Sequence, residues 1–327
     1  MMKRIMCLLL LLFLLWGCAA EEETVVPEFV LTYAENQPED YPTTLAAKEF
    51  ARLVEERTEG KVIIQVKCDG EFGSEQEVIA QMHFGGVDFT RVSLSSVSDE
   101  FPILNVLQLP YLYEDSDHMW RILDGQIGTD FLEVFSGGDL VGLSWYDSGA
   151  RSFYSTTPIH CAEDLKGKTV RVQNSQMMFD MVTLLGAKPV NIAYSDVYAA
   201  FETGQIDVAE NNWPSYHSQF HYEFAPFYTV DQHTRVPEIQ LASERTWEQL
   251  PESYRQIIRQ CARESALYQR ELWADQDSRS RANAVICGSQ IIQLSEEQLQ
   301  EFRQLVQPLY AQYCTDHMDL ITQIQNG

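Results

Sequence analysis

Segments typical of β-strands alternate with segments typical of amphipathic helices along most of this chain. The first three strand-like segments cover residues 28–34, 61–67 and 87–92, and helical segments at 42–57 and from 74 or 75 to about 82 separate them. Strands separated by helices at this spacing are typical of parallel βαβ units. The alternation therefore predicts an α/β fold.

The same alternation returns in the second half of the chain. With 327 residues, the chain exceeds the size at which one hydrophobic core stops growing, so two lobes are expected. The stretch from Pro251 to about Cys287 is longer than an ordinary globular helix, and it predicts either one helix that spans both lobes or two adjacent helices. Further strands are expected near 140–145, 168–172 and 238–242, and further helices near 177–185 and 196–203.

The lobes are expected to be formed by discontinuous segments. We expect hinges near 146–151 and 234–237, where two-lobed binding proteins change conformation. The expected division is a signal at 1–17, a tether at 18–28, lobe I at 29–148 plus about 237–276, and lobe II at 149–236 plus about 277–327.

The N-terminus has the pattern of a secretion signal. Lys3 and Arg4 precede an apolar run at 5–16, which is too short to cross a bilayer comfortably. The run ends in Gly17-Cys18 and resembles a lipoprotein signal, in which Cys18 is lipidated, although Trp16 is bulky for that motif. We expect an exported protein with a lipid anchor on the outer face of the cytoplasmic membrane; the alternative is an ordinary secretion signal.

The charge balance excludes nucleic acid as a partner and restricts how an anionic ligand could bind. The chain has 23 basic and 48 acidic residues, a formal charge of -25, whereas nucleic-acid binding needs clustered Lys and Arg. An anionic ligand would need a few local arginines to overcome the overall field.

Sequence motifs of enzymes are not evident. The chain lacks a GxSxG elbow, a Walker loop, a GxGxxG turn and an HExxH pair. His217 and His221 have helical spacing, but with no third ligand nearby they are expected to be packing or surface residues. We therefore expect a protein that is not an enzyme and has no metal or cofactor.

Arg171 and Arg151 are the candidate anion-binding residues. Arg171 lies within a strand-like segment, and in open α/β sheets ligands bind beyond the carboxyl ends of strands. Strand position alone leaves a solvent-facing edge strand as the commoner explanation for such an arginine. Arg151 lies at the expected lobe crossing, where the same alternative applies.

Four ordered blocks carry a family resemblance. They are GARSFY at 149–154, DLKGKTVRV at 164–172, AYSDVY at 193–198 and QIDVAEN at 205–211. In order and spacing they resemble the solute-binding proteins of tripartite ATP-independent periplasmic (TRAP) transporters. This resemblance covers nearly all of the chain after the signal and implies a two-lobed periplasmic-binding-protein fold, with TRAP membrane permease subunits as partners.

The resemblance also implies roles for particular residues. Arg171 matches the arginine that forms a two-pronged pair with the ligand carboxylate, which a planar guanidinium suits. Arg151 corresponds to a second basic contact, Asn211 to an amide at the carboxylate or an adjacent hydroxyl, and Tyr194 to an aromatic position beside the ligand.

The segments at 34–38, 90–93, 209–216, 221–222 and 230–233 look like the branch that binds sugar acids, especially hexuronates such as glucuronate or galacturonate. Hexuronates carry one carboxylate and several hydroxyls, so acceptors such as Glu35 or Glu75 are expected along the ring. Arg91 could supply a second cation, which leaves a dicarboxylate as an alternative ligand. Trp213 and Trp145 could stack on the sugar or pack in the core. The expected ligand contacts are Arg171, Arg151, Asn211, Glu35, Glu75, Arg91, Asn36, Tyr194, Trp213 and Asn212.

Two alternative functions remain open on the sequence. The same fold could present its ligand to a membrane sensor instead of a permease. An exported enzyme that acts on uronates is the third hypothesis.

Overall fold

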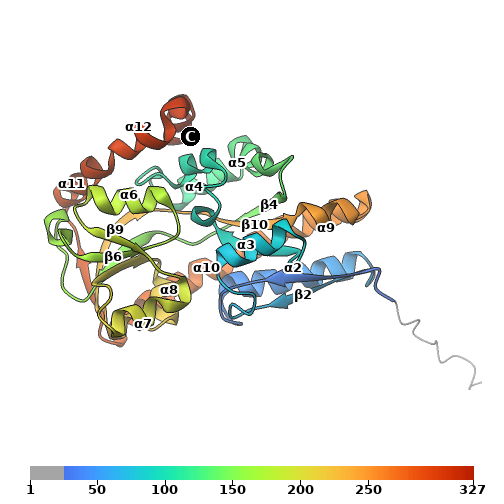
Figure 1. Cartoon of the computed structure of the whole chain (residues 1–327), viewed down its shortest axis with the longest axis horizontal. Helices are drawn as coiled ribbons and strands as arrows, with labels where there is room; N and C mark the ends of the chain where they lie inside the picture. The colour runs from blue at the N-terminus through green and yellow to red at the C-terminus, as the bar shows by residue number, and fades with distance from the viewer. Residues whose placement is uncertain (1–25) are drawn as a thin grey trace, which may run out of the picture.

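The computed structural model describes residues 26–327, so the signal segment and Cys18 lie outside the described residues. Two β-sheets lie side by side with helices around them, which confirms the two-lobed α/β fold (Figure 1). We name the part with the five-stranded sheet lobe I and the part with the six-stranded sheet lobe II. The lobe I order is β2 (Val62–Lys67), β1 (Phe29–Ala34), β3 (Phe89–Ser93), β10 (Glu238–Ser243) and β4 (Leu140–Tyr146). The lobe II order is β11 (Gln290–Gln293), β9 (Phe227–Thr234), β5 (Arg151–Ser155), β8 (Val208–Asn211), β6 (Thr169–Val172) and β7 (Lys188–Asn191).

The sheets are mixed, whereas the sequence pattern predicts parallel units. The parallel pairs are confirmed for β1 with β2 and β3, and for β6 with β7 and β8. The prediction is wrong for β10, which is antiparallel to β3 and β4. The strand β5, which the sequence pattern did not predict, is antiparallel to β8 and β9. These strands differ because the chain passes from β4 to β5 and from β9 to β10 without a helix, and both passages connect the two sheets.

Helices cover the sheets of both lobes. The helix α2 begins at Pro42, whose fixed φ suits a first turn, and buries Ala46, Phe50 and Val54 at helical spacing. In lobe I the helices are α2 (Pro42–Arg57), α3 (Glu75–His83), α4 (Ser116–Leu123), α5 (Gln126–Leu132) and α9 (Glu244–Gln249), with the 3₁₀ segments η1 (Leu94–Ser96) and η2 (Pro102–Gln108). In lobe II they are α6 (Gln176–Leu184), α7 (Val197–Glu202) and α8 (Trp213–Ser218), with the 3₁₀ turn η5 (Tyr194–Asp196).

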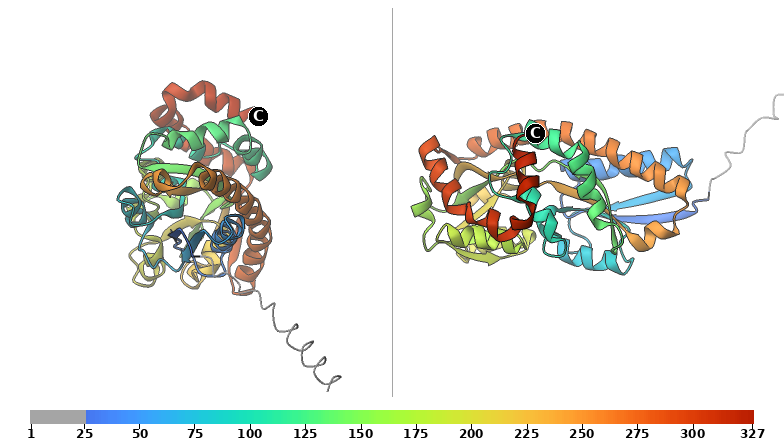
Figure 2. Two further views of the ribbon diagram at one scale, coloured as in Figure 1. Left: turned by 90° about the vertical axis from the view of Figure 1, so that its right-hand side faces the viewer. Right: turned by 90° about the horizontal axis from the view of Figure 1, so that it is seen from above.

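One long helix spans both lobes. The helix α10 (Glu252–Ile286) has 35 residues and contacts α2 and β4 of lobe I as well as α8 of lobe II. The view from above shows it running along the length of the molecule (Figure 2). The predicted spanning helix is therefore confirmed as a single element. Among the described residues, 26–327, no helix combines the length and apolar character that crossing a membrane requires.

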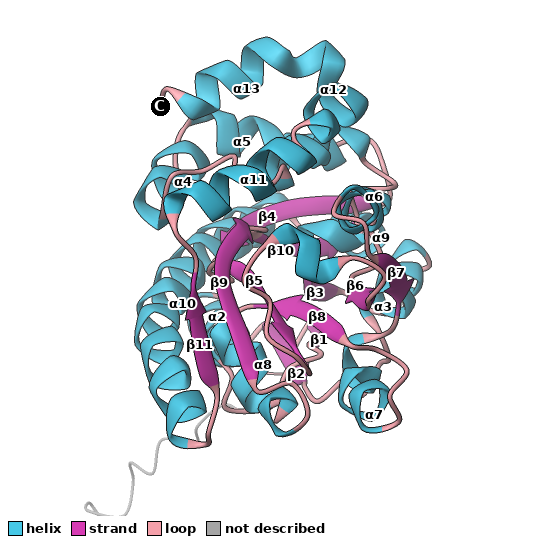
Figure 3. Ribbon diagram, turned by 90° about the vertical axis from the view of Figure 1, so that its left-hand side faces the viewer, coloured by secondary structure: helices cyan, strands magenta, loops and turns pink. Residues whose placement is uncertain are grey.

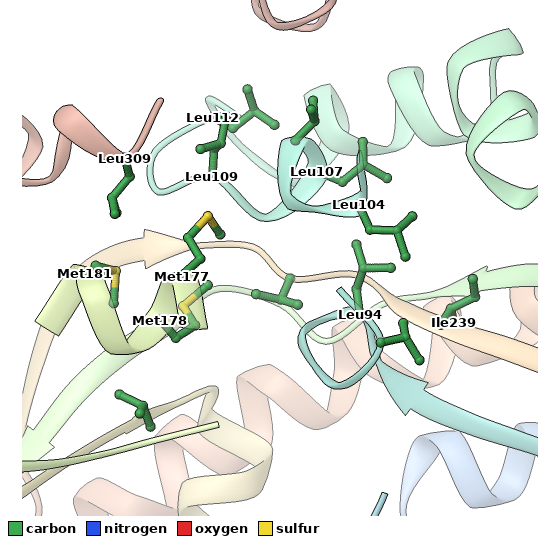
Figure 4. Close-up of a cluster of buried hydrophobic side chains, with 14 of the residues drawn as sticks. Leu94, Leu104, Leu107, Leu109, Leu112, Met177, Met178, Met181, Ile239 and Leu309 are labelled. Carbon is green, nitrogen blue, oxygen red and sulfur yellow. The ribbon is translucent and has the colours of Figure 1, made fainter. Parts of the chain in front are cut away.

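The C-terminal helices contact both lobes. They are α11 (Glu296–Val306), α12 (Pro308–Cys314) and α13 (Met318–Gln325), all labelled in Figure 3. The helix α11 contacts α6, α12 contacts α6 and η2, and α13 lies beside α4, where the His118 ring is 2.6 Å from the Ile324 carbonyl. Leu309 of α12 joins a buried cluster that contains Leu104 and Leu109 from lobe I and Met177 from lobe II (Figure 4). Apolar packing thus links the two sheets on one side of the molecule.

Candidate ligand-binding cleft

A cavity of about 830 Å³ lies between the lobes and is lined by residues of both. From lobe II it receives the residues that follow or end the parallel strands β6, β7 and β8, including Gln173, Asn191 and Asn211. From lobe I it receives the loop after β1 and the first turn of α3, where a capping box between Ser74 and Glu77 fixes the start of the helix. A cleft at the carboxyl ends of parallel strands is the usual place for a ligand in such sheets.

Arg171 lies on β6 between β7 and β8, so it is not on an edge strand. The residue is only 4% exposed, and its Nε donates to the carbonyl of Ile192 at 2.9 Å. Among the described residues, its two terminal nitrogens have no hydrogen-bond partner, and the residue lines the cleft. Burial lowers the pKa of Arg171, while Glu210 acts in the opposite direction. A guanidinium nevertheless stays charged, so this cation is largely buried without a carboxylate in contact.

Arg151 lies at the start of β5, where a buried chain of charges holds it. Its Nε and Nη2 contact both carboxylate oxygens of Glu210, and Nη1 donates to Asn211 Oδ1 at 3.0 Å. His233 Nε2 lies 3.5 Å from Glu210, and its Nδ1 lies 2.8 Å from Asp231. Burial would raise the pKa of Glu210, but Arg151 and His233 lower it to about 2. Burial opposes charge on His233, but Asp231 and Glu210 raise its pKa to about 9.

The lobe I wall of the cleft is acidic. Arg91 Nη1 donates to Glu238 at 2.5 Å and to Glu75 at 3.2 Å, and its Nε donates to Glu35 at 3.1 Å. Nη2 contacts Glu35 as well and donates to Asn36 Oδ1 at 2.6 Å. All three nitrogens of this guanidinium are therefore engaged by the protein itself.

Several buried polar atoms that line the cleft have no partner within residues 26–327. They belong to Thr43, Gln76, Ser93, Gln173 and Trp273, and two of them are hydroxyl groups. Buried polar groups in folded proteins are nearly always hydrogen-bonded, so these atoms are available to bond water or a polar ligand in the cavity. The cleft therefore suits a ligand with many polar groups.

Two hydrogen bonds join the lobes across the cleft. Tyr41, which precedes α2, has its hydroxyl 3.1 Å from the Ser215 hydroxyl on α8. Tyr194 in η5 donates to Gln37 Oε1 at 3.3 Å. The two lobes thus meet in a closed arrangement.

Most of the ligand contacts expected from the sequence come together around this cleft. Arg171, Arg151, Asn211, Asn212, Tyr194, Asn36, Glu75 and Arg91 all line it.

Glu35 and Trp213 are not among the residues that line the cavity. Glu35 lies behind Arg91, and both of its carboxylate oxygens accept hydrogen bonds from the protein. Trp213 is stacked on Tyr228 with ring centroids 3.4 Å apart in the core of lobe II. Trp145 is also a core residue, and its Nε1 donates to the carbonyl of Gly128 at 3.0 Å. Both tryptophans pack in the core, the second of the two roles considered for them.

Glu238 and Trp273 are among the residues that line the cleft although the sequence did not single them out. Glu238 begins β10, directly after the passage from lobe II, and Trp273 comes from the middle of α10. Sequence spacing gives no signal for Glu238, because its partner Arg91 is 147 positions away. Trp273 could have been suspected as an aromatic residue on the helix that both lobes share.

Within the described part of the chain, no group of three or more His, Cys, Asp or Glu residues is arranged to hold a metal ion. His221 is instead buried, with its Nδ1 2.9 Å from the Tyr154 hydroxyl. Burial lowers the pKa of His221 to about 3, so the ring is neutral.

Comparison with known proteins agrees with this architecture. A model of the family described as bacterial extracellular solute-binding protein, family 7, matches residues 33–316. A solute-binding protein of Chromohalobacter salexigens is 36% identical over 294 residues, 89% of this chain and 87% of that protein.

Solved structures give the same result. A TRAP periplasmic solute-binding protein of Xanthobacter autotrophicus Py2 with bound β-D-galacturonate is 38% identical, with a TM-score of 0.88, and the match covers 91% of this chain and 99% of that chain. A TRAP periplasmic solute-binding protein of Pseudomonas putida F1 with bound D-glucuronate is 32% identical, also with a TM-score of 0.88, and the match covers 90% and 96%.

Proposed function

This chain belongs to family 7 of the bacterial extracellular solute-binding proteins, and from that premise we propose that it is a TRAP transporter receptor for a hexuronate. The receptor captures the sugar acid between its lobes and delivers it to the membrane permease without changing it chemically. Galacturonate and glucuronate, which differ only at C4, are bound by relatives that match this chain over at least 90% of its length.

The observation that carries the proposal is the state of Arg171. Of the three arginines that line the cleft, Arg91 and Arg151 contact carboxylates of the protein, whereas Arg171 contacts none among the described residues. A buried cation without a partner is unfavourable, and a ligand carboxylate removes that penalty through two parallel N–H donors. Arg171 is therefore the carboxylate-binding residue of the proposal.

The opposite wall fits the remainder of a sugar acid. Glu75 and Glu238 offer acceptors, and the buried hydroxyls of Thr43 and Ser93 have no partner among residues 26–327. Sugar hydroxyls both donate and accept, so they can satisfy these groups together. A ligand with one carboxylate and several hydroxyls matches both walls of the cleft.

The experiment that tests this function compares the wild-type protein with Arg171→Ala by calorimetry against galacturonate and glucuronate. We expect the variant to lose about 2–5 kcal/mol of binding free energy, because the ligand carboxylate would be buried without its partner. Its thermal stability should not fall, since the change removes a buried cation that has no carboxylate partner among the described residues.

Arg279→Ala is the matched control, because Arg279 also lies on a regular element but its side chain is 63% exposed and its partner Asp275 is exposed too. This variant should bind like the wild type. The proposed function would be contradicted if the wild-type protein bound neither uronate saturably, or if Arg171→Ala bound them with unchanged affinity.

The lipid anchor is a separate proposal that rests on the sequence pattern at Gly17-Cys18. Lipidation would keep the receptor on the membrane surface that holds the permease. Cells fed radiolabelled palmitate should label the wild-type protein and not Cys18→Ser. Equal labelling of both proteins, or of neither, would rule the anchor out.

A further inference from the structure

Three carboxylates converge on a single guanidinium in the lobe I wall. Arg91 contacts Glu35, Glu75 and Glu238, so one positive charge faces three acidic groups. Burial and the neighbouring Glu238 raise the pKa of Glu75 to about 7. A raised pKa of this origin means that additional negative charge is unfavourable at this wall.

Glu238 is the acidic residue with hydrogen-bonding capacity left. It is only 8% exposed and lines the cleft, and its Oε2 accepts the bond from Arg91. No described residue donates to its Oε1. Its register partner in the antiparallel β3–β10 pair is Ser93, whose buried Oγ also has no partner among the described residues. An acceptor beside a hydroxyl that can donate and accept matches an alcohol group of a ligand.

Glu35 provides an internal contrast. It contacts the same guanidinium, but both of its oxygens are occupied, by Arg91 and by the backbone N–H of Gln37 at 3.1 Å. It does not line the cleft. Two carboxylates of the same cluster thus differ in whether a ligand can reach them.

Resting on the proposed hexuronate function, we propose that Glu238 is a specificity-determining residue of the cleft. Its free oxygen accepts a ligand hydroxyl beside Ser93, and together with Glu75 it excludes ligands that carry a second carboxylate at this end. A carboxylate offers no proton to Glu238 and brings a like charge to a buried acidic wall, which opposes binding strongly. Arg91 does not offset this repulsion, because its single positive charge already faces three carboxylates and its nitrogens have no free position for another.

Gluconate and glucarate test the proposal, because these open-chain acids differ only at C6, which is an alcohol in the first and a carboxylate in the second. Each would compete with galacturonate for the wild-type protein. Gluconate should compete at least about 100-fold better than glucarate. In Glu238→Gln this ratio should fall below about 10-fold, because the substitution removes the charge and adds N–H donors. The same variant should bind galacturonate about 10-fold more weakly, because a charged acceptor is replaced by a neutral one.

Glu35→Gln is the matched control, since it removes a negative charge that contacts the same Arg91 and does not alter the cleft lining. It should retain most of the difference between gluconate and glucarate. An equal loss of selectivity in Glu35→Gln would assign the effect to the charge of the whole cluster and overturn the role of Glu238.

An unchanged galacturonate affinity in Glu238→Gln would overturn the role of Glu238 too. If neither open-chain acid competes, this affinity is the measurement that tests the role. Thermal unfolding of each variant, which should match the wild type, checks folding. These outcomes are distinct from a failure of the proposed function, in which the wild-type protein would bind no uronate.

Discussion

At the scale of single residues, the three arginines of the cleft differ in what their neighbours leave available. Arg91 donates to an excess of acidic groups, and Arg151 belongs to a chain with Glu210, His233 and Asp231 in which the charges alternate. That chain is close to neutral as a whole, so it orients Arg151 without adding net charge to lobe II. Arg171 is therefore the cleft arginine whose charge is not balanced by a carboxylate in contact among the described residues, and Asp196 adds one acidic group to the same wall.

The row of alternating charges that includes His233 makes the stability of the protein depend on pH. His233 has a pKa of about 9 in the folded protein, against an ordinary value of 6.5, so the folded state binds this proton more tightly than the unfolded state. Its contribution is complete below pH 6.5 and is lost as the pH rises through about 9. We expect this group to account for a decrease of about 3 kcal/mol in the free energy of unfolding over that range.

Urea unfolding at pH 6.5, 7.5 and 9 measures this decrease. His233→Asn should be less stable at pH 6.5 and should lack the wild-type decrease between pH 6.5 and 9. His160→Asn, which changes an exposed histidine, should retain it. Equal pH dependence in His233→Asn and the wild type would show that folding does not raise the pKa of His233.

At the scale of elements, the apolar pattern predicts the five strands of lobe I and misses several strands of lobe II, among them two that contain buried paired charges. The helix expected at 42–57 has the same bounds in the structure. The strand β9 was not predicted; its sequence FYTVDQHT interrupts the apolar pattern with Asp231 and His233. Both are buried, and their partner Glu210 lies on β8, another strand that the pattern did not show. Pairing across a sheet is invisible to local periodicity.

The same reasoning explains how much of the site could be predicted. Strand position alone left Arg171 more probable as a surface residue, and the four ordered blocks were needed to reverse that interpretation. Glu238 follows Pro237 at the start of β10, so nothing in its neighbourhood marks it as a ligand contact. Its position in the cleft results from the passage of the chain between lobes, which only the tertiary structure reveals.

At the scale of the whole molecule, three connections join the lobes. Two are the short passages at 147–150 and 235–237, and the third is α10. Gln269 of α10 accepts from the backbone N–H of Asp147 and donates to its carbonyl, both at 2.8 Å, which fastens the first passage to the helix. Ser148 Oγ donates to the carbonyl of Val236 at 2.5 Å and links the two passages. Opening of the cleft is therefore expected to bend these passages and α10 together, as a hinge.

The bond between Tyr41 and Ser215 should favour the closed arrangement, because it joins the lobes on the side where they separate. Tyr41→Phe keeps the ring and removes this bond, which is worth about 0.5–1.5 kcal/mol. We expect affinity for galacturonate to fall about 3- to 10-fold, mainly through faster dissociation, because the ligand leaves from the open form. Stopped-flow kinetics would measure both rates.

A double-mutant cycle separates loss of this bond from loss of a direct ligand contact. If the bond is responsible, Ser215→Ala should have a similar effect, and the double variant should lose no more than either single variant. Small-angle scattering of the ligand-free protein should show a larger radius of gyration in Tyr41→Phe than in the wild type. Tyr254→Phe is the control, because the Tyr254 hydroxyl donates to Glu28 at 3.1 Å, away from the cleft. Additive losses in the double variant, with an unchanged radius of gyration, would show that these hydroxyls act on the ligand and do not hold the lobes together.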